Sequence, residues 1–177
     1  MDFRARDVMT REPTTVLPET PVEELLHLFR VSHFSGIPVV DHDRKAVGMI
    51  SETDVLRALA YAIGPPGSGE FQVSFRKGRT TGLTARLLDH GDREGIDALA
   101  LIRELLGRKV IELMSPVVHT CHVDAPLAEV CETLVWKEIH RVVVVDDDHR
   151  VVGLISSIDA VRVFGELLRK HEQKGAR

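Results

Sequence analysis

The sequence predicts an α/β (α+β) fold in which two β-α-β-β-α repeats pack sheet to sheet with pseudo-twofold symmetry, with a mainly helical insertion between them. The first observation behind this is an internal repeat. Residues 8–57 align with residues 113–162 at a constant offset of 105 without a gap, and 14 of these 50 pairs are identical. About three matches are expected by chance from ordinary residue usage. The second observation is that helical and strand-like apolar spacings follow in the same order in both copies.

Each copy begins with a short predicted strand, at residues 14–17 and 119–123, and continues into a helix. In the first copy Thr20 is a suitable N-cap and Pro21 suits the first helical position. Apolar residues then recur at helical spacing, which predicts one buried face. The two apolar stripes are Val22, Leu25, Leu26 and Phe29 in the first copy, and Leu127, Val130, Cys131 and Leu134 in the second.

Two further strands and a second helix complete each copy. Short acidic segments predict the turns between the strands, and Ser51 or Ser156 begins the second helix. A unit of about 50 residues buries too little surface to be stable alone, so two are expected to pack together. Such packing leaves clefts, which are common ligand sites. The predicted strands cover residues 37–41 and 46–50 in the first copy, and 142–146 and 151–155 in the second.

Residues 62–110 interrupt the repeat. Their composition predicts a loop at 64–69, a short strand at 70–75, and helices at 83–90 and 93–106. The insertion is either a cover for part of the module or a lid or partner-binding arm. A cover is favoured because surface insertions are usually tolerated without function. The predicted division is a first repeat at 1–61, the insertion at 62–110, and a second repeat with a C-terminal helix at 111–177.

The composition argues against several classes of protein. The chain has 23 basic and 27 acidic residues and a net charge of -4, so it has no basic excess for binding nucleic acid or a membrane surface. Two cysteines, Cys121 and Cys131, do not make a disulfide framework. The start resembles no signal peptide, and no apolar run approaches the length of a membrane span. A cytoplasmic location is the default expectation.

Short motifs in both copies resemble the CBS domain family. In the first copy these are Val8-Met9-Thr10, Pro38-Val39-Val40-Asp41 and Gly48–Asp54. In the second they are Leu113-Met114-Ser115, Val143–Asp146 and Gly153–Asp159. The resemblance implies a stand-alone tandem pair, called a Bateman module, that binds AMP, ADP, ATP or a related ligand such as S-adenosylmethionine. It also implies a homodimer of four repeats, an unidentified regulated partner, and no required cofactor.

Ser51-x-x-Asp54 and Ser156-x-x-Asp159 are the main candidate binding residues. Each stands where a strand runs into a helix, and a helix N-terminus favours a phosphate. The Asp carboxylate can accept hydrogen bonds from both hydroxyls of a ribose. The same spacing is also that of a capping box, which stabilises a helix with no ligand at all.

Two further groups complete the candidate site. His140 and Arg141 precede a strand, where they can hold a phosphate or else form a solvated pair at the strand start. They resemble the His-Arg segments in the γ subunit of AMP-activated protein kinase, which implies contact with a nucleotide phosphate. Ser35 and Gly36 stand at the matching places of the first copy, so the two sites are expected to differ. Residues placed by analogy around an adenine ring, or else in ordinary core packing, are Val16, Ile37, Pro38, Cys121 and Val142.

Other chemistries are less well supported by the sequence. His119, Cys121 and His122 invite a metal hypothesis, but no second close-spaced ligand pair accompanies them, so no metal is expected. No nucleophile–base pattern and no Gly-rich phosphate loop is present, so the chain is not expected to be an enzyme. The alternative to a nucleotide sensor is a ligand-free dimerisation or interaction module.

Overall fold

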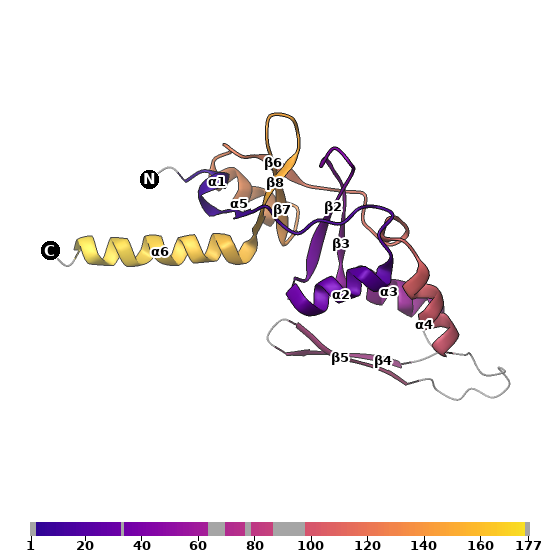
Figure 1. Cartoon of the computed structure of the whole chain (residues 1–177). Coiled ribbons are helices and arrows are strands. Elements are labelled where there is room, and N and C mark those ends of the chain that lie inside the picture. The colour runs from indigo at the N-terminus through magenta and orange to yellow at the C-terminus, as the bar shows by residue number, and fades with distance from the viewer. Residues whose placement is uncertain (1–2, 33, 64–69, 77–78, 87–97, 176–177) are drawn as a thin grey trace. The chain divides into compact units, whose positions relative to one another are not determined.

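The computed structural model describes residues 3–32, 34–63, 70–76, 79–86 and 98–175, and Figure 1 labels its helices and strands. The chain divides into two compact units, each assembled from segments that are distant in sequence. In the described ranges, no helix is both long and apolar enough to cross a membrane. Unit 1 consists of residues 1–17, 38–49 and 116–177, and unit 2 of residues 18–37 and 50–115.

Unit 1 contains a mixed four-stranded sheet. The elements of its first and last segments are α1 (Ala5–Val8), β1 (Thr10–Arg11), β6 (Thr120–His122), α5 (Leu127–Trp136), β7 (Arg141–Val145), β8 (Val151–Ser156) and α6 (Ser157–Gly175). The strand order is β1-β8-β7-β6, with β6 parallel to β7 and the other neighbours antiparallel. The chain order β6-α5-β7-β8-α6 confirms the β-α-β-β-α order predicted for the second copy.

The first copy contributes β2 (Gly36–Val40) and β3 (Ala46–Ser51), which pair in a two-stranded sheet. The strand expected at residues 14–17 is reduced to a single parallel bridge between Val16 and Val39. The Val16 N–H donates to the Pro38 carbonyl at 3.1 Å, and the Val16 carbonyl accepts the Val40 N–H at 2.9 Å. The two repeats therefore share their order of elements but not the length of their first strand.

The acidic turns have the same structure in both copies. Asp41 Oδ1 accepts the backbone N–H of Asp43 at 3.0 Å and that of Lys45 at 2.8 Å. These bonds close a tight turn, a common role of Asp side chains. In the second copy, Asp146 Oδ1 accepts the N–H groups of Asp148 and Arg150 at the same two distances.

Strand β7 lies at the centre of the unit 1 core and is buried on both faces. Val142 and Val144 join one cluster with Ile155 of β8, to which α1, α5 and α6 contribute. Val143 and Val145 face the other way, because successive side chains of a strand point to opposite faces. On that side they cluster with Val40, Val151, Ala46 and Met49, so residues of β2 and β3 cover the second face.

Unit 2 is built around helices. They are α2 (Val22–Ser32), α3 (Glu52–Ile63), α4 (Ala98–Gly107) and the short 3-10 helix η1 (Val110–Glu112). Helix α4 packs against both α2 and α3. Of the predicted apolar stripe of α2, Val22, Leu25 and Phe29 are buried and Leu26 is partly buried. The segment before α2 pairs with the segment after α4, because Val22 donates to the Arg108 carbonyl and Val110 to the Thr20 carbonyl.

The insertion differs from the mainly helical segment that the sequence predicts. Strand β4 (Glu70–Arg76) confirms the strand expected at 70–75, and it pairs antiparallel with β5 (Arg79–Arg86). The helix expected over 83–90 is therefore wrong for residues 83–86, and residues 87–90 lie outside the described part. The threonines of β5 favour a strand, and cross-strand pairing outweighs the weak helical pattern. The helix expected at 93–106 is present as α4, with residues 93–97 outside the described part.

Candidate functional site

The Ser-x-x-Asp motif of unit 1 lies where β8 ends and α6 begins. Asp159 is 8% exposed, and its Oδ2 accepts hydrogen bonds from the Ser156 backbone N–H at 2.9 Å and from Ser156 Oγ at 2.6 Å. The Asp159 N–H points back to Ser156 Oγ at 3.3 Å. These reciprocal contacts satisfy donors that a helix start would otherwise leave unpaired. The side chains therefore cap α6.

The same geometry recurs in unit 2, at the junction of β3 and α3. Asp54 Oδ2 accepts the Ser51 backbone N–H at 2.9 Å and Ser51 Oγ at 2.5 Å. The Asp54 N–H lies 3.4 Å from Ser51 Oγ. The capping role that the sequence left open as an alternative is thus present in both copies.

The second carboxylate oxygen of each Asp faces an arginine one turn along the helix. Arg162 lies 3.1 Å from Asp159 Oδ1, and Arg57 lies 3.4 Å from Asp54 Oδ1. Both arginine side chains are well exposed, at 64% and 72%. The carboxylate partners are only 11% and 15% exposed, so each pair joins a nearly buried acid to an exposed base. A carboxylate also has more acceptor positions than these contacts use.

His140 and Arg141 lie beside the Ser156 motif in unit 1. Arg141 begins β7 and stands directly opposite Ser156 across the β7–β8 ladder. The His140 carbonyl accepts the backbone N–H of Ser157 at 3.0 Å. His140 is exposed, whereas Arg141 is partly buried and interacts with a neighbouring group. The structure thus brings an arginine, a histidine and the capped helix start to one end of one sheet.

The residues suggested for an adenine slot lie mostly in the hydrophobic core. Val142 is 0% exposed, Ile37 1% and Val16 5%, and Pro38 is buried as well. Their side chains show the ordinary core packing that the sequence could not separate from ligand binding.

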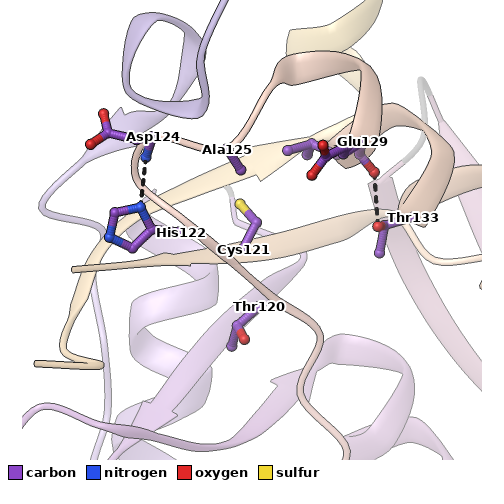
Figure 2. Close-up of a pocket in the computed structure, with 8 residues that line it drawn as sticks. Thr120, Cys121, His122, Asp124, Ala125, Glu129 and Thr133 are labelled. Atoms are coloured by element: carbon purple, nitrogen blue, oxygen red, sulfur yellow. Dashed lines mark hydrogen bonds between the residues drawn. The ribbon is translucent and has the colours of Figure 1, made fainter. Parts of the chain in front are cut away.

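Cys121 differs from the other residues suggested for the adenine slot, because it lines an open pocket of about 380 Å³ between β6 and α5 (Figure 2). The pocket walls include Thr120, Glu129 and Thr133, and Thr133 Oγ1 donates to the Glu129 carbonyl at 2.9 Å. Burial raises the pKa of the Cys121 thiol to about 11. At neutral pH this thiol stays protonated, so it is a packing residue rather than a nucleophile.

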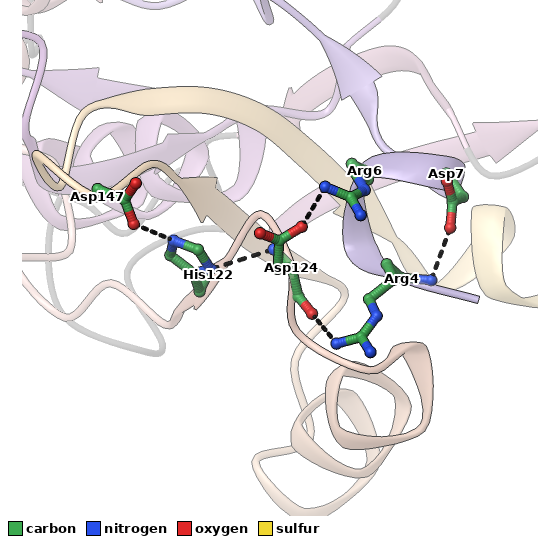
Figure 3. A network of polar contacts seen from close by, with 6 residues as sticks. All are labelled: Arg4, Arg6, Asp7, His122, Asp124 and Asp147. Atoms are coloured by element: carbon green, nitrogen blue, oxygen red, sulfur yellow. Dashed lines mark hydrogen bonds and ion pairs between the residues drawn. The ribbon is translucent and has the colours of Figure 1, made fainter. Parts of the chain in front are cut away.

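A polar network that the sequence analysis missed holds the N-terminal segment to the loop after β6 (Figure 3). Arg6 forms an ion pair with Asp124 at 2.5 Å, and Arg4 donates to the Asp124 carbonyl at 2.8 Å. His122 accepts the Asp124 N–H on Nδ1 at 3.2 Å and contacts Asp147 through Nε2 at 3.0 Å. No repeated motif marks this network, because residues 17 and 19 of the first copy are Leu and Glu.

The metal hypothesis gains no support from the geometry. Among the residues that the structure describes, no group of three or more His, Cys, Asp or Glu side chains is placed to hold a metal ion. His122 is instead engaged with Asp147 and with the Asp124 backbone.

Comparison with known proteins identifies the repeat. The family model described as "CBS domain" matches residues 5–61 and residues 110–166, which together exceed half of the chain. The chain belongs to the CBS domain family. The tandem CBS pair inferred from the internal repeat and the short motifs is thereby confirmed.

Relatives of the CBS pair cover most of the chain. CBS domain-containing protein CBSX1, chloroplastic, from Arabidopsis thaliana is 28% identical over 159 residues, which cover 89% of this chain and 61% of CBSX1. The CBS domain pair of MJ0100, solved with 5'-methylthioadenosine and S-adenosyl-L-methionine, has a TM-score of 0.64 at 23% identity, covering 94% of this chain and 98% of that one. CBSX2 with AMP has a TM-score of 0.64 at 21% identity, covering 93% and 98%.

This chain spans less than two thirds of the length of the first relatives it matches, 61% of CBSX1 and 40% of the Methanocaldococcus jannaschii protein MJ1232. The likeness to the two solved pairs concerns the fold. CBSX1 carries the word chloroplastic in its name, so the cytoplasmic location expected from the sequence stays a prediction.

Proposed function

We propose that the chain is a regulatory module that binds an adenosine-containing ligand and, through it, modulates a partner protein. The observation that carries the proposal is the gathering of His140, Arg141, Ser156 and Asp159 where α6 begins. MJ0100 was solved with 5'-methylthioadenosine and S-adenosyl-L-methionine, and CBSX2 with AMP. All three of these ligands contain adenosine.

The contacts suggest a role for each residue of the second copy. Asp159 Oδ1 accepts hydrogen bonds from the ribose, exchanging the exposed Arg162 for sugar hydroxyls. Ser156 and the start of α6 face a phosphate where the ligand carries one, and Arg141 binds the same phosphate. Oδ2 keeps its bonds to Ser156, which hold the carboxylate in place.

The first copy offers a weaker version of the same chemistry. Ser51 and Asp54 repeat the cap, but Ser35 and Gly36 replace the His-Arg pair. We therefore expect phosphorylated ligands such as AMP, ADP and ATP to prefer the second copy. A ligand without a phosphate, such as S-adenosylmethionine, should differ less in affinity between the two copies.

The described residues favour regulation over catalysis. In both Asp carboxylates Oδ2 is bonded to the serine, and the Cys121 thiol is protonated at neutral pH. Neither arrangement resembles an activated nucleophile beside a general base.

A thermal-shift series with AMP, ADP, ATP and S-adenosylmethionine tests the proposal. A ligand at one hundred times its Kd adds about 2.7 kcal/mol to the free energy of unfolding. This raises the Tm by roughly 5–10 °C for a chain of this size. Asp159→Asn should remove most of the AMP shift, because the amide presents a donor as well as an acceptor to the ribose. Asp54→Asn should remove less of it.

The matched control is Asp148→Asn, since Asp148 is a well-exposed carboxylate of the same unit. It should keep the full shift. A double variant at Asp54 and Asp159 that keeps the full shift would contradict the ribose assignment.

A ligand-free interaction module remains the second candidate, because α6 carries an exposed apolar stripe. Ile158, Val161, Phe164 and Leu168 are 67%, 65%, 61% and 49% exposed and recur at helical spacing on one face. We propose a second copy of this chain as the occupant, which would give the homodimer of four repeats. Exposed stripes of this kind mark association surfaces.

Light scattering tests this second candidate. The wild-type chain should have twice the monomer mass of 19.7 kDa, and Phe164→Glu should shift it to the monomer. Tyr61→Glu is the control, because Tyr61 is also exposed but lies on α3. A monomeric wild type at micromolar concentration would rule out the dimer. A stable dimer that responds to no adenosine ligand would favour this candidate over the sensor.

A further inference from the structure

Unit 1 contains a second, larger hollow that the proposed ligand site does not use. Its cavity volume is about 690 Å³. It is lined by β1 and the residues after it, by the β2–β3 turn, and by the segment that leads into β8. Cavities that hold small organic molecules have volumes of about 300–1,000 Å³.

Three arginines line this hollow, one from each of the three segments. They are Arg11 on β1, Arg44 in the β2–β3 turn, and Arg150 just before β8. All three are exposed residues. Guanidinium groups repel one another, so three around one hollow are most favourable when an anion lies among them.

Backbone contacts hold the three segments in place. Arg11 stands opposite Gly153 in the β1–β8 ladder, and the N–H of Glu12 donates to the Val152 carbonyl at 3.2 Å. The Arg44 carbonyl accepts the Val151 N–H at 2.9 Å. The arginines are therefore displayed by a sheet edge and a tight turn rather than by loose loops.

The turn between β2 and β3 has a defined backbone conformation. Arg44 has a φ of 65°, a left-handed conformation that non-glycine residues adopt infrequently. Lys45 forms an antiparallel bridge with Arg150, which brings the two turns together within unit 1. The Asp41 side chain fixes the turn by accepting two backbone N–H groups.

The carboxylates near the hollow offset part of its charge. Asp146 lines the hollow, and its Oδ1 accepts two backbone N–H groups of its turn. Glu12 is the second acid of the lining. Arg150 contacts Asp148 at 3.3 Å, and Arg44 reaches the Val151 carbonyl at 3.5 Å, so both contacts are long and easily exchanged. The lining keeps more positive than negative side chains.

We propose that this hollow binds a multiply charged anion of the di- or triphosphate class, separately from the adenosine site. Three arginines supply more charge-assisted donors than the oxygens of one phosphate use, and a chain of two or three phosphates offers more acceptor oxygens to them. Val151 and Val152 begin β8 and Ser156 ends it, so the two sites lie about 15 Å apart at 3.3–3.4 Å per residue.

Calorimetric titration with pyrophosphate and with tripolyphosphate tests the inference, since neither probe carries a nucleoside. Tripolyphosphate should bind more tightly than inorganic phosphate, and its affinity should fall as salt is raised. Arg11→Gln, Arg44→Gln and Arg150→Gln should each weaken tripolyphosphate binding by roughly tenfold or more, the usual effect of losing a charge-assisted hydrogen bond.

Arg169→Gln is the matched control, because it removes an exposed arginine on α6 and should leave the affinity unchanged. The double variant at Asp54 and Asp159 should also keep tripolyphosphate binding, which separates this site from the proposed adenosine site. Absence of tripolyphosphate binding at low salt, or unchanged affinity in the triple arginine variant, would overturn the inference.

Discussion

Ile155→Ala is expected to lower the free energy of unfolding by about 2–5 kcal/mol. Ile155 is 0% exposed, and it joins Val142 and Val144 in the cluster that α1, α5 and α6 cover. Removing its outer carbons loses their transfer free energy and leaves a cavity that a close-packed sheet cannot fill. Urea denaturation followed by circular dichroism measures the change.

Ile111→Ala is the matched control for this substitution. Ile111 is 54% exposed, so the same change in side chain should alter the free energy of unfolding by less than about 1 kcal/mol. Equal losses in the two variants would contradict the packing described for β8.

Gly153→Ala is expected to destabilise the chain by about 1–3 kcal/mol through overpacking. Gly153 is buried in β8, and an added Cβ would clash with Met9 Sδ and lie 2.9 Å from Met9 Cγ and 3.0 Å from Met9 Cβ. The Met9 side chain would have to move out of the cluster that it packs against. Thermal denaturation measures the loss, which should be several degrees in Tm.

Two further variants separate the clash from a general effect of removing glycine. A Cβ added by Gly165→Ala on α6 has no neighbour within 4 Å, so this change should be neutral or raise the free energy of unfolding by up to about 1 kcal/mol. Gly153→Ala combined with Met9→Ala should cost less than the sum of the single changes, because the two residues are in contact. Strict additivity in this cycle would show that Met9 is not the obstacle.

The capped helix starts show how the sequence and the structure bear on the same motif. Ser-x-x-Asp spacing predicts either a cap or a ribose contact, and the structure has the cap in both copies. The two roles need different oxygens, because Oδ2 holds the serine while Oδ1 faces an exposed arginine. Capping through Oδ2 is therefore compatible with the ribose contact that we propose for Oδ1.

The sequence patterns predicted the repeat and the turns correctly, because turns depend on residues that are close together in the sequence. The offset of 105 identified both copies, and the acidic turns at Asp41 and Asp146 formed with matching hydrogen bonds. The insertion was predicted less well, since residues 83–86 form a strand that pairs with β4. A helical pattern of a few residues is weak, and pairing with a distant strand can outweigh it.

The sequence by itself determined the two CBS repeats and the order of their helices and strands, because the same local spacings recur in both copies. For Ser-x-x-Asp it left a cap and a ribose contact as alternatives. Only the tertiary structure decided that Val142 is core, that Arg141 stands opposite Ser156, and that Arg11, Arg44 and Arg150 line one hollow. Such neighbours are far apart along the chain. They meet because backbone ladders and buried apolar faces bring the segments together, and no periodicity in the sequence records that meeting.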